Sequence, residues 1–510
     1  MELAGADPAR WGSSGPHHLV RRPEPPVPFL SGVVVRLSRG VPLATAALLT
    51  GVAAWPAPVA AATGADDHCG HGGRLRVPGA AFVQTACLPD LTTTGLAGTP
   101  YTDMADQAGL TARDTRVPSG VPGVQIDGYF PDSSHFNTTH GWRHDAQFVI
   151  RLPDHWNGGL VVTGAPGTRK QYATDKAISD QVLAQGYAYA ATDKGNSSAD
   201  FYRDEARPGE AVAEWNTRTT QLTRAARGVL TERYGRAPRR TYMTGMSNGG
   251  YLTRWQLEHH PELYDGGVDW EGALWTAGGP NLLTSLPAAV ARSLGSAGDS
   301  ALYAVGFARG SEFLWPYHEQ ACWGVTQKIY RAEFDPGYDP ACPGASAGST
   351  PEQILAPCPS DAAYDYAARP ASVHRAVARV ALTGRIGKPL ITLHGDLDSL
   401  LPRAADSDVY ARMVDASGRG ALHRYYTIEG GTHVDGLYDT YPDRLRPILP
   451  CYRSAFDALA AWVEHGVRPP ADRTVGRPAS GDVVDSCALG GRAPGHQDRG
   501  RRISGRVPYG

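Results

Sequence analysis

The chain has 510 residues, of which 42% are apolar and 20% charged, and its formal net charge is −2. This composition is ordinary for a globular protein with a large core, and the length leaves room for an inserted second domain. The near-neutral charge gives no electrostatic reason to expect nucleic acid or an anionic membrane as a partner, and the sequence has no zinc-finger spacing or phosphate-binding loop. Few lysines beside many Arg, Ala, Gly and Pro residues favour a bacterial source rich in G and C.

Residues 1–62 are expected to form an N-terminal extension and a secretion signal. Arg36 and Arg39 precede the apolar run 41–55, and small residues follow it, so we place the cleavage site near residues 60–62. The run is too short and too interrupted for a spanning helix, which leaves a membrane anchor as the less favoured alternative. Because residues 33–35 are valines, translation could begin there instead of at Met1. The mature protein is predicted to be secreted without a stable membrane anchor.

All seven cysteines follow this signal, which agrees with an oxidising compartment. We expect Cys69 to pair with Cys87, and Cys451 with Cys487. Among Cys322, Cys342 and Cys358 one is left over, and the sequence does not decide which. None of the cysteines has C-x-x-C spacing and the histidines are not clustered with them, so no metal site is predicted.

Residues 63–280 are interpreted as the first part of an α/β core. Alternation over residues 123–152 predicts antiparallel strands, and 159–163 is a buried strand. A helix at 175–185, a strand at 187–192 and a long helix at 217–234 follow. Such β-α alternation predicts a mostly parallel sheet with helices on both faces.

The sequence Gly245-Met-Ser-Asn-Gly249 lies between a predicted strand, 241–244, and a predicted helix, 251–260. A serine at the centre of G-x-S-x-G in this context is the nucleophile elbow of α/β-hydrolases. Ser247 is therefore predicted to be a catalytic nucleophile. A second G-x-S-x-G surrounds Ser346, but it has neither the strand nor the helix, so Ser346 is interpreted as a loop residue.

Two backbone N–H groups are expected to form an oxyanion hole. One belongs to Asn248, directly after the nucleophile. The second is expected in the loop after strand 159–163, where Pro166 has no N–H and Ala165 or Gly167 is the better donor. A plain tight turn is the alternative for this loop.

Residues 281–386 interrupt the β-α alternation and are interpreted as an inserted lid domain rich in Ala, Pro and aromatic residues. The predicted substrate contacts are Trp270 and Glu271 at the end of the preceding strand, and Trp315 and Trp323 in the lid. Polar lid residues that could orient a carboxylate end are Arg309, His318, Glu319 and Arg331. Asp335 and Asp339 could bind calcium, but solvated loop carboxylates are the favoured alternative.

The α/β pattern resumes over residues 387–470, and 471–510 are expected to be a partly disordered tail. The motif H-G-x-x-D-x-x-x-P after a buried strand selects Asp398 as the triad acid, with Asp396 as the alternative. His433 lies in a glycine-flanked loop after the last strand, which completes the chain order Ser, Asp, His. His394 is built into a strand end and is interpreted as structural.

These residues predict a proton relay. His433 takes the proton of Ser247 during attack on a carbonyl and returns it to the leaving alcohol, while Asp398 fixes the imidazole tautomer. This chemistry calls for no metal and no organic cofactor.

Five motifs carry a family resemblance: Gly245-Met-Ser-Asn-Gly-Gly-Tyr, His260-Pro-Glu-Leu-Tyr-Asp-Gly, Ala191-Thr-Asp-Lys-Gly, His394-Gly-Asp-Leu-Asp and Gly431-Thr-His. Over about residues 123–470 the chain resembles the tannase and feruloyl esterase group and its relatives, the 3-hydroxybutyrate oligomer hydrolases. The resemblance implies an exported serine esterase of α/β-hydrolase fold with a large lid. Tannase-type enzymes carry a bonded cysteine pair where this chain has Met246 and Val434. That departure puts tannin and feruloyl specificity in question.

The predicted substrates are short hydroxyacyl esters, such as 3-hydroxybutyrate oligomers, or aromatic esters of the feruloyl or galloyl type. Two alternatives are a secreted serine peptidase of the same fold and a non-catalytic binding protein. A peptidase of the prolyl oligopeptidase kind needs an N-terminal propeller, for which residues 63–122 leave no room. The complete triad argues against a binding protein. The oligomeric state is left open.

Overall fold

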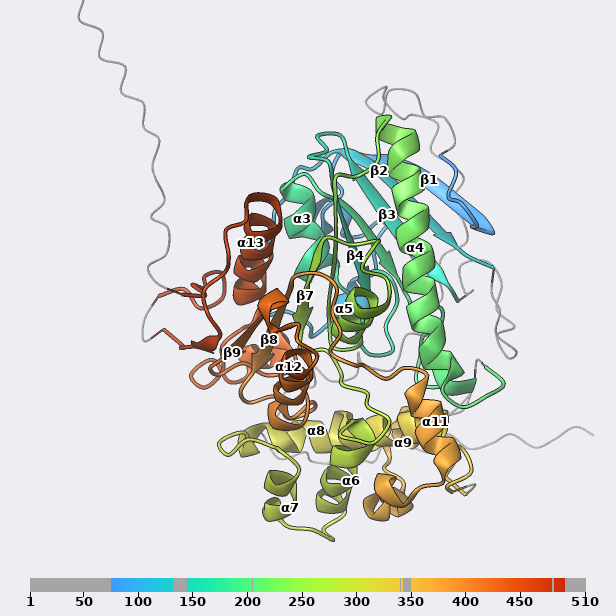
Figure 1. Cartoon of the computed structure of the whole chain (residues 1–510), viewed down its shortest axis with the longest axis vertical. Helices are drawn as coiled ribbons and strands as arrows, with labels where there is room; N and C mark the ends of the chain where they lie inside the picture. Colours follow the sequence, from blue (N-terminus) through green and yellow to red (C-terminus); the bar gives the residue numbers. More distant parts are fainter. Residues whose placement is uncertain are drawn as a thin grey trace, which may run out of the picture. The chain divides into compact units, whose positions relative to one another are not determined.

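One sheet runs through the molecule, in the order β1-β2-β3-β5-β4-β6-β7-β8-β9-β10 (Figure 1). The computed structural model describes residues 75–131, 145–203, 205–339, 341–342, 350–478 and 481–490. The strands are β1 (Phe82–Leu88), β2 (Gly123–Tyr129), β3 (Gln147–Pro153), β4 (Gly159–Gly164), β5 (Ala188–Thr192), β6 (Arg240–Met246), β7 (Gly266–Trp270), β8 (Leu390–Gly395), β9 (His423–Ile428) and β10 (Arg473–Val475). The predicted secretion signal, Cys69, Ser346 and the last twenty residues lie outside the described part.

The sheet is antiparallel at one end and parallel elsewhere. β1, β2 and β3 pair antiparallel, and β3 pairs antiparallel with β5. From β5 through β4 to β10 every neighbouring pair is parallel. The fold is therefore α/β with a mostly parallel sheet, as the β-α alternation predicted. β10 adds an ordered edge strand within the predicted tail.

Helices cover both faces of the sheet, because alternate strand residues point to opposite sides. Leu160 and Val162 of β4 pack in one apolar core with α4 (Glu210–Tyr234), α5 (Asn248–His259) and α12 (Ser407–Ala416). Val161, between them, belongs to a second core with α3 (Asp180–Ala184) and α13 (Leu449–His465). Two short helices, α1 (Thr93–Leu96) and α2 (Met104–Gln107), precede β2.

Several predicted boundaries move. α4 begins at Glu210, seven residues earlier than residue 217, and the predicted helix over 175–185 is a π turn at 175–179 followed by α3. β7 ends at Trp270, because Glu271 has a φ of 51°, outside the range of strand residues.

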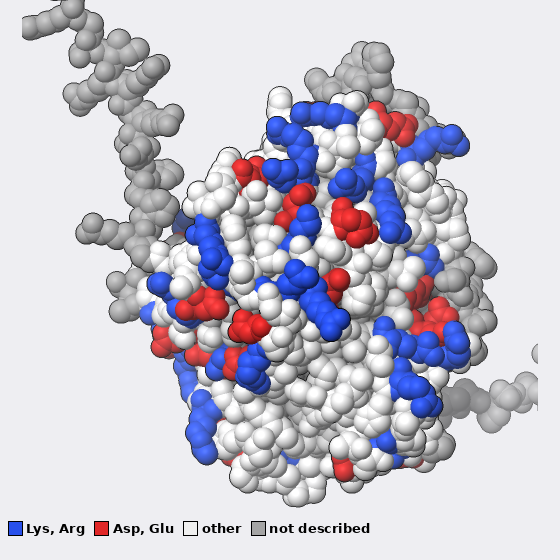
Figure 2. Space-filling model, viewed as in Figure 1, with Lys and Arg blue, Asp and Glu red and all other residues white. Residues whose placement is uncertain are grey.

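The helices that follow β7 form a helical segment, and they lie together at one end of the molecule in Figure 1. It contains α6 (Leu282–Ser293), α7 (Asp299–Ala304), α8 (Trp315–Ala321), α9 (Trp323–Phe334), α10 (Pro351–Leu355) and α11 (Ala371–Ala378). α6 packs against α9. Figure 2 shows positive and negative side chains intermixed over much of one face, with few of them over the lower part. This face therefore has no large field of a single sign.

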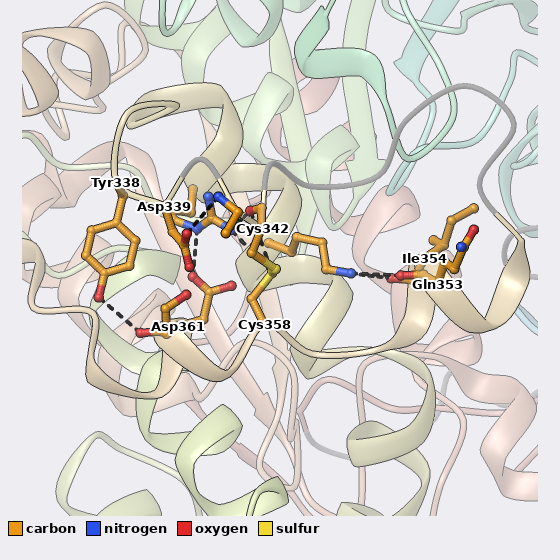
Figure 3. Close-up of a disulfide and its surroundings, with 11 residues drawn as sticks. Tyr338, Asp339, Cys342, Gln353, Ile354, Cys358 and Asp361 are labelled. Atoms are coloured by element: carbon orange, nitrogen blue, oxygen red, sulfur yellow. Dashed lines mark hydrogen bonds and ion pairs between the residues drawn. A yellow bond between two sulfur atoms is a disulfide. The ribbon is translucent and has the colours of Figure 1, made fainter.

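The disulfide Cys342–Cys358 lies beside α9 (Figure 3). Arg331 of α9 donates a 2.6 Å hydrogen bond to the Cys342 carbonyl and pairs with Asp361 at 2.7 Å. Lys328, one turn earlier, donates to the carbonyls of residues 353 and 354 at 3.0 and 3.1 Å. The buried face of α9 is thus tied to the cross-linked loop.

The cysteine predictions are resolved as far as the described residues allow. Cys451 is bonded to Cys487, as predicted. Cys322 is the free thiol of the undecided group. Cys87 is disulfide-bonded, and its predicted partner lies outside the described residues.

Asp335 forms an ion pair with Arg369 at 2.6 Å, and Asp339 accepts a hydrogen bond from the Ala341 backbone N–H. Asp335 is therefore committed to a protein partner instead of being open to calcium. No helix among the described residues is long and apolar enough to cross a membrane.

Candidate active site

The turn between β6 and α5 places Ser247 in a backbone conformation that few non-glycine residues adopt, with φ 56° and ψ −120°. The turn is very tight. A Cβ on Gly245 would lie 2.5 Å from the Gly249 carbonyl carbon, and a Cβ on Gly249 would lie 2.4 Å from the Gly164 carbonyl oxygen. Only glycine fits at these two positions, which is the physical reason for the G-x-S-x-G pattern.

His433 bridges the serine and a carboxylate. Its Nε2 lies 3.0 Å from Ser247 Oγ, and its Nδ1 lies 2.9 Å from Asp398 Oδ2. Because a carboxylate only accepts, Nδ1–H donates to Asp398 and Nε2 is left to accept the serine proton. The structure thus brings together the three residues predicted as the triad.

Asp398 is fully buried and well held. Its Oδ1 accepts the backbone N–H groups of Leu400 and Leu401 at 2.7 and 2.9 Å. Burial alone would raise the pKa of this carboxyl, but His433 and then His394 hold it well below its usual range. Asp398 is therefore ionised across the ordinary pH range.

Asp396, the alternative triad acid, and His394 form hydrogen bonds outside the triad. Asp396 accepts the Gly430 N–H at 2.8 Å. The two ring nitrogens of His394 contact Ser407 Oγ at 2.7 Å and the Leu401 carbonyl at 2.9 Å. His394 thus braces the loop that carries Asp398.

One predicted oxyanion donor is wrong. The Ala165 N–H donates to the Thr192 carbonyl at 3.0 Å, because β4 and β5 continue their pairing at this point. Gly167, the other candidate in the loop, lines the cavity beside Ser247. Asn248 stands in the first turn of α5, where backbone N–H groups have no intrahelical acceptor. Asn248 and Gly167 are therefore the remaining candidates for the oxyanion donors.

The side chain of Asn248 also has a structural role. It donates to the Gly167 carbonyl at 3.0 Å and contacts the Tyr330 hydroxyl at 2.8 Å. Tyr330 belongs to α9, so this amide joins the elbow, the oxyanion loop and the helical segment.

A cavity of about 130 Å³ opens on Ser247 and His433. Its walls come from both the sheet loops and the helical segment, and most are apolar. The apolar lining residues include Leu110, Ala199, Ala273, Leu282, Val325 and Ile329, and the polar ones include Thr168, Arg169, Cys322, Thr326 and Tyr330. The site is a small pocket with a few polar groups.

None of the three predicted tryptophans lines this cavity. Trp270 stacks on Tyr452 at 5.6 Å in the sheet core. The Trp315 indole donates to Ser311 Oγ at 3.0 Å, and that of Trp323 donates to the Ser399 carbonyl at 2.7 Å. All three are fully buried core residues. Large aromatic rings are more often used for packing than for ligand contact.

Glu271 lies behind the histidine instead of facing substrate. Its Oε1 accepts the Gly395 N–H at 2.7 Å, and its Oε2 lies 3.8 Å from His433 Nδ1. Glu271, Asp398 and His433 each place a nitrogen or oxygen atom within 4.8 Å of the other two. Both imidazole nitrogens of His433 already have protein partners, Asp398 and Ser247.

Two buried side chains of the helical segment lie near the site: His318, which was predicted to orient a carboxylate end of the substrate, and Cys322, which was given no such role. Burial lowers the pKa of His318 to about 3, so this ring is neutral where it stacks on Trp323. Burial raises the pKa of the Cys322 thiol to about 12, so the free cysteine in the cavity wall is no thiolate nucleophile. No sequence motif marks Cys322, Arg169 or Tyr330 as a neighbour of Ser247.

Comparison with known proteins agrees with this geometry. Residues 134–271 match the family model for tannase and feruloyl esterase. The chain resembles the tannase and feruloyl esterase family. The match includes Ser247 and Asn248, whereas Asp398 and His433 lie beyond it. The predicted resemblance is confirmed.

One characterised relative is similar to part of this chain. Mono(2-hydroxyethyl) terephthalate hydrolase of Piscinibacter sakaiensis is 27% identical over 139 residues, which cover 25% of this chain and 23% of that protein. The match therefore spans less than a quarter of that relative.

Two solved structures are similar over longer stretches. Feruloyl esterase B from Aspergillus oryzae has a TM-score of 0.44 and 16% identity, covering 76% of this chain and 88% of that chain. Tannin acyl hydrolase from Aspergillus niger has a TM-score of 0.45 and 15% identity, covering 76% and 83%.

Proposed function

We propose that the protein is a secreted serine carboxylic-ester hydrolase that cleaves short hydroxyacyl or aromatic esters. The observation that carries this proposal is the position of His433, 3.0 Å from Ser247 Oγ and 2.9 Å from Asp398 Oδ2. A hydroxyl is a weak nucleophile, and a base at hydrogen-bonding distance is what activates it.

The reaction follows from these contacts. Ser247 Oγ attacks the ester carbonyl carbon as His433 Nε2 takes the hydroxyl proton, and the backbone N–H groups of Asn248 and Gly167 donate to the oxyanion. His433 then protonates the leaving alcohol, which leaves an acyl group on Ser247. A water molecule, activated by the same imidazole, attacks the acyl carbonyl and releases the acid.

The dimensions of the cavity support a short acyl group. About 130 Å³ of mostly apolar space suits a small aromatic ring or a hydroxyacyl chain better than a long fatty chain. We propose that the helical segment 281–386 acts as the lid of this pocket, since α9 supplies Val325, Ile329 and Tyr330 to its wall.

We propose a partner for the polar end of the substrate other than the predicted Arg309, His318, Glu319 and Arg331. Arg309 stacks on Tyr303 at 4.2 Å, Arg331 pairs with Asp361, and Glu319 pairs with Arg292. Arg169 lines the cavity instead, where its guanidinium donates to the carbonyls of Asp106 and Ala108. We propose that its remaining N–H groups bind a hydroxyl or carboxylate oxygen of the substrate.

Export is proposed from the signal-like residues 36–62 and from the disulfides. Disulfide bonds persist in oxidising compartments. N-terminal sequencing of the protein recovered from culture medium is expected to begin near residues 61–66. A protein retained in the cytoplasm with all its thiols reduced would contradict export.

A substrate panel tests the proposed activity. Initial rates are measured with 3-hydroxybutyrate dimers and trimers, methyl ferulate, methyl gallate, a long-chain nitrophenyl ester and a small peptide amide. We expect kcat/KM to be highest on one of the short hydroxyacyl or aromatic esters. A tenfold preference for the long-chain ester contradicts the short-acyl proposal, and a preference for the peptide indicates a peptidase.

A further inference from the structure

We propose that Glu271 is a second acid of the catalytic site, a positioning residue able to replace Asp398 as the carboxylate partner of His433. The inference rests on the proposed function, because it assigns a role through the catalytic imidazole. It concerns a residue that neither the triad motif nor the substrate-contact prediction accounts for.

The position of Glu271 follows from the order of the strands. β7 lies between β6, which leads to Ser247, and β8, which leads to Asp398. Trp270, the last residue of β7, pairs with Met246 of β6 and with Leu393 of β8. The Glu271 N–H then donates to the Leu393 carbonyl at 2.8 Å. Because the carboxyl ends of parallel strands share one edge of a sheet, Glu271 enters the site between nucleophile and acid.

One carboxylate oxygen of Glu271 accepts a hydrogen bond, and the other has no hydrogen-bond partner among the described residues. It is fully buried, and Oε1 accepts the Gly395 N–H at 2.7 Å. Oε2 has no hydrogen-bond partner within the described residues, and it lies 3.8 Å from His433 Nδ1. A buried polar atom without a partner is costly and calls for a reason. A small movement would bring Oε2 to hydrogen-bonding distance from Nδ1.

The backbone gives a second reason to look for a role. Glu271 has a φ of 51°, in the left-handed region that favours glycine. Non-glycine residues with backbone angles in this region are concentrated at functional sites. A glutamate here directs a carboxyl toward the imidazole, which glycine could not do.

Electrostatics explain why Asp398 is the partner in the native enzyme. Burial, and then the charge of Asp398, raise the pKa of Glu271 well above its usual range, with smaller contributions from Asp435 and Asp269. The charge of Asp269 is partly offset by Arg254, 2.6 Å away. Two carboxyls this close do not both ionise readily, so Glu271 keeps its proton while Asp398 is charged. Removing Asp398 removes the largest opposing charge and favours ionised Glu271 beside His433.

A four-member mutant cycle tests this proposal on one short nitrophenyl ester. The proteins are the wild type, Glu271→Gln, Asp398→Ala and the double variant. We expect Glu271→Gln to lower kcat about threefold in the wild-type background and about thirtyfold or more beside Asp398→Ala. We further expect the pH profiles of kcat for Asp398→Ala and the double variant to differ, because ionisation of Glu271 adds to the effect of His433 deprotonation only in Asp398→Ala.

A merely structural Glu271 gives a different result. The glutamine substitution would then lower kcat by the same factor in both backgrounds, with no difference in pH profile, and that outcome overturns the proposal. So does an Asp398→Ala variant as inactive as Ser247→Ala. If Asp398→Ala is not recovered folded, Asp398→Asn keeps an acceptor for the Leu400 and Leu401 N–H groups and enters the same cycle. If Ser247→Ala turns over the ester normally, the proposed function itself fails.

Discussion

The Tyr330 hydroxyl and the Asn248 side-chain amide lie 2.8 Å apart, and this contact ties helix α9 to the residue that follows the nucleophile. The same amide donates to the Gly167 carbonyl at 3.0 Å. The Asn248 side chain therefore connects both proposed oxyanion donors to α9. The helical segment is thus in direct contact with the residue that follows the proposed nucleophile.

Removing this contact should slow catalysis more than it weakens the fold. Tyr330→Phe takes away one hydroxyl and leaves Asn248 less firmly held, so we expect kcat on a short ester to fall about tenfold. The melting temperature should fall by only a few degrees, as for one lost hydrogen bond. Tyr338→Phe is the matched control, since its hydroxyl bonds the Ser360 carbonyl away from the cavity. Equal losses of kcat in both variants would refute the coupling.

The elbow should not tolerate a methyl group. Gly249→Ala would place a Cβ 2.4 Å from the Gly164 carbonyl oxygen, whereas a Cβ on Gly278 meets nothing within 4 Å. We expect Gly249→Ala to lose most activity and a few kcal/mol of unfolding free energy, because the backbone must move to relieve the clash. Gly278→Ala should behave as the wild type. Activity and urea unfolding measured on both proteins decide this, and an active, stable Gly249→Ala would show that the turn is less tight than described.

Local motifs allowed much of this site to be predicted. Ser247, Asp398 and His433 each follow a strand, so their positions at one sheet edge follow from the fold. The error at Ala165 arose because the sequence does not show that its N–H continues the pairing with β5. Trp315 and Trp323 were misassigned because burial depends on tertiary packing. The role inferred for Glu271 depends on strand order and a backbone angle, which no motif encodes.

The disulfide beside α9 should matter for stability more than for chemistry. Cys342 and Cys358 are 16 residues apart, and a loop of this length corresponds to about 3 kcal/mol of unfolding free energy in the chain-entropy model. We expect the double variant Cys342→Ser/Cys358→Ser to melt several degrees lower than the wild type. Cys322→Ser, which removes only a free thiol, is the control. Unchanged melting of the double variant would contradict the expected stabilisation.

Glu333 should make stability depend on pH. Burial raises the pKa of this α9 carboxyl to about 8, against its ordinary value of 4.5, although the Val212 N–H donates to it. The folded protein therefore binds the proton more tightly than the unfolded chain. The protonated carboxyl therefore contributes fully to the unfolding free energy below pH 4.5. As the pH rises from 4.5 to about 8, this contribution is lost. The unfolding free energy falls by up to about 1.4 kcal/mol for each pH unit in that range.

Glu333→Gln cannot ionise, so its unfolding free energy should fall less than that of the wild type between pH 5 and 8. Urea unfolding of both proteins at the two pH values gives the comparison. Parallel pH dependence of the two proteins would show that Glu333 does not contribute.

Covalent labelling tests most directly whether Ser247 is a nucleophile activated by His433. The protein is treated with a phosphonate ester that reacts with activated serines, and its peptides are analysed by mass spectrometry. We predict one adduct, on Ser247, with turnover lost in proportion to labelling, and no adduct in His433→Ala. An enzyme that hydrolyses esters while Ser247 stays unlabelled, or that is labelled equally without His433, would contradict the account.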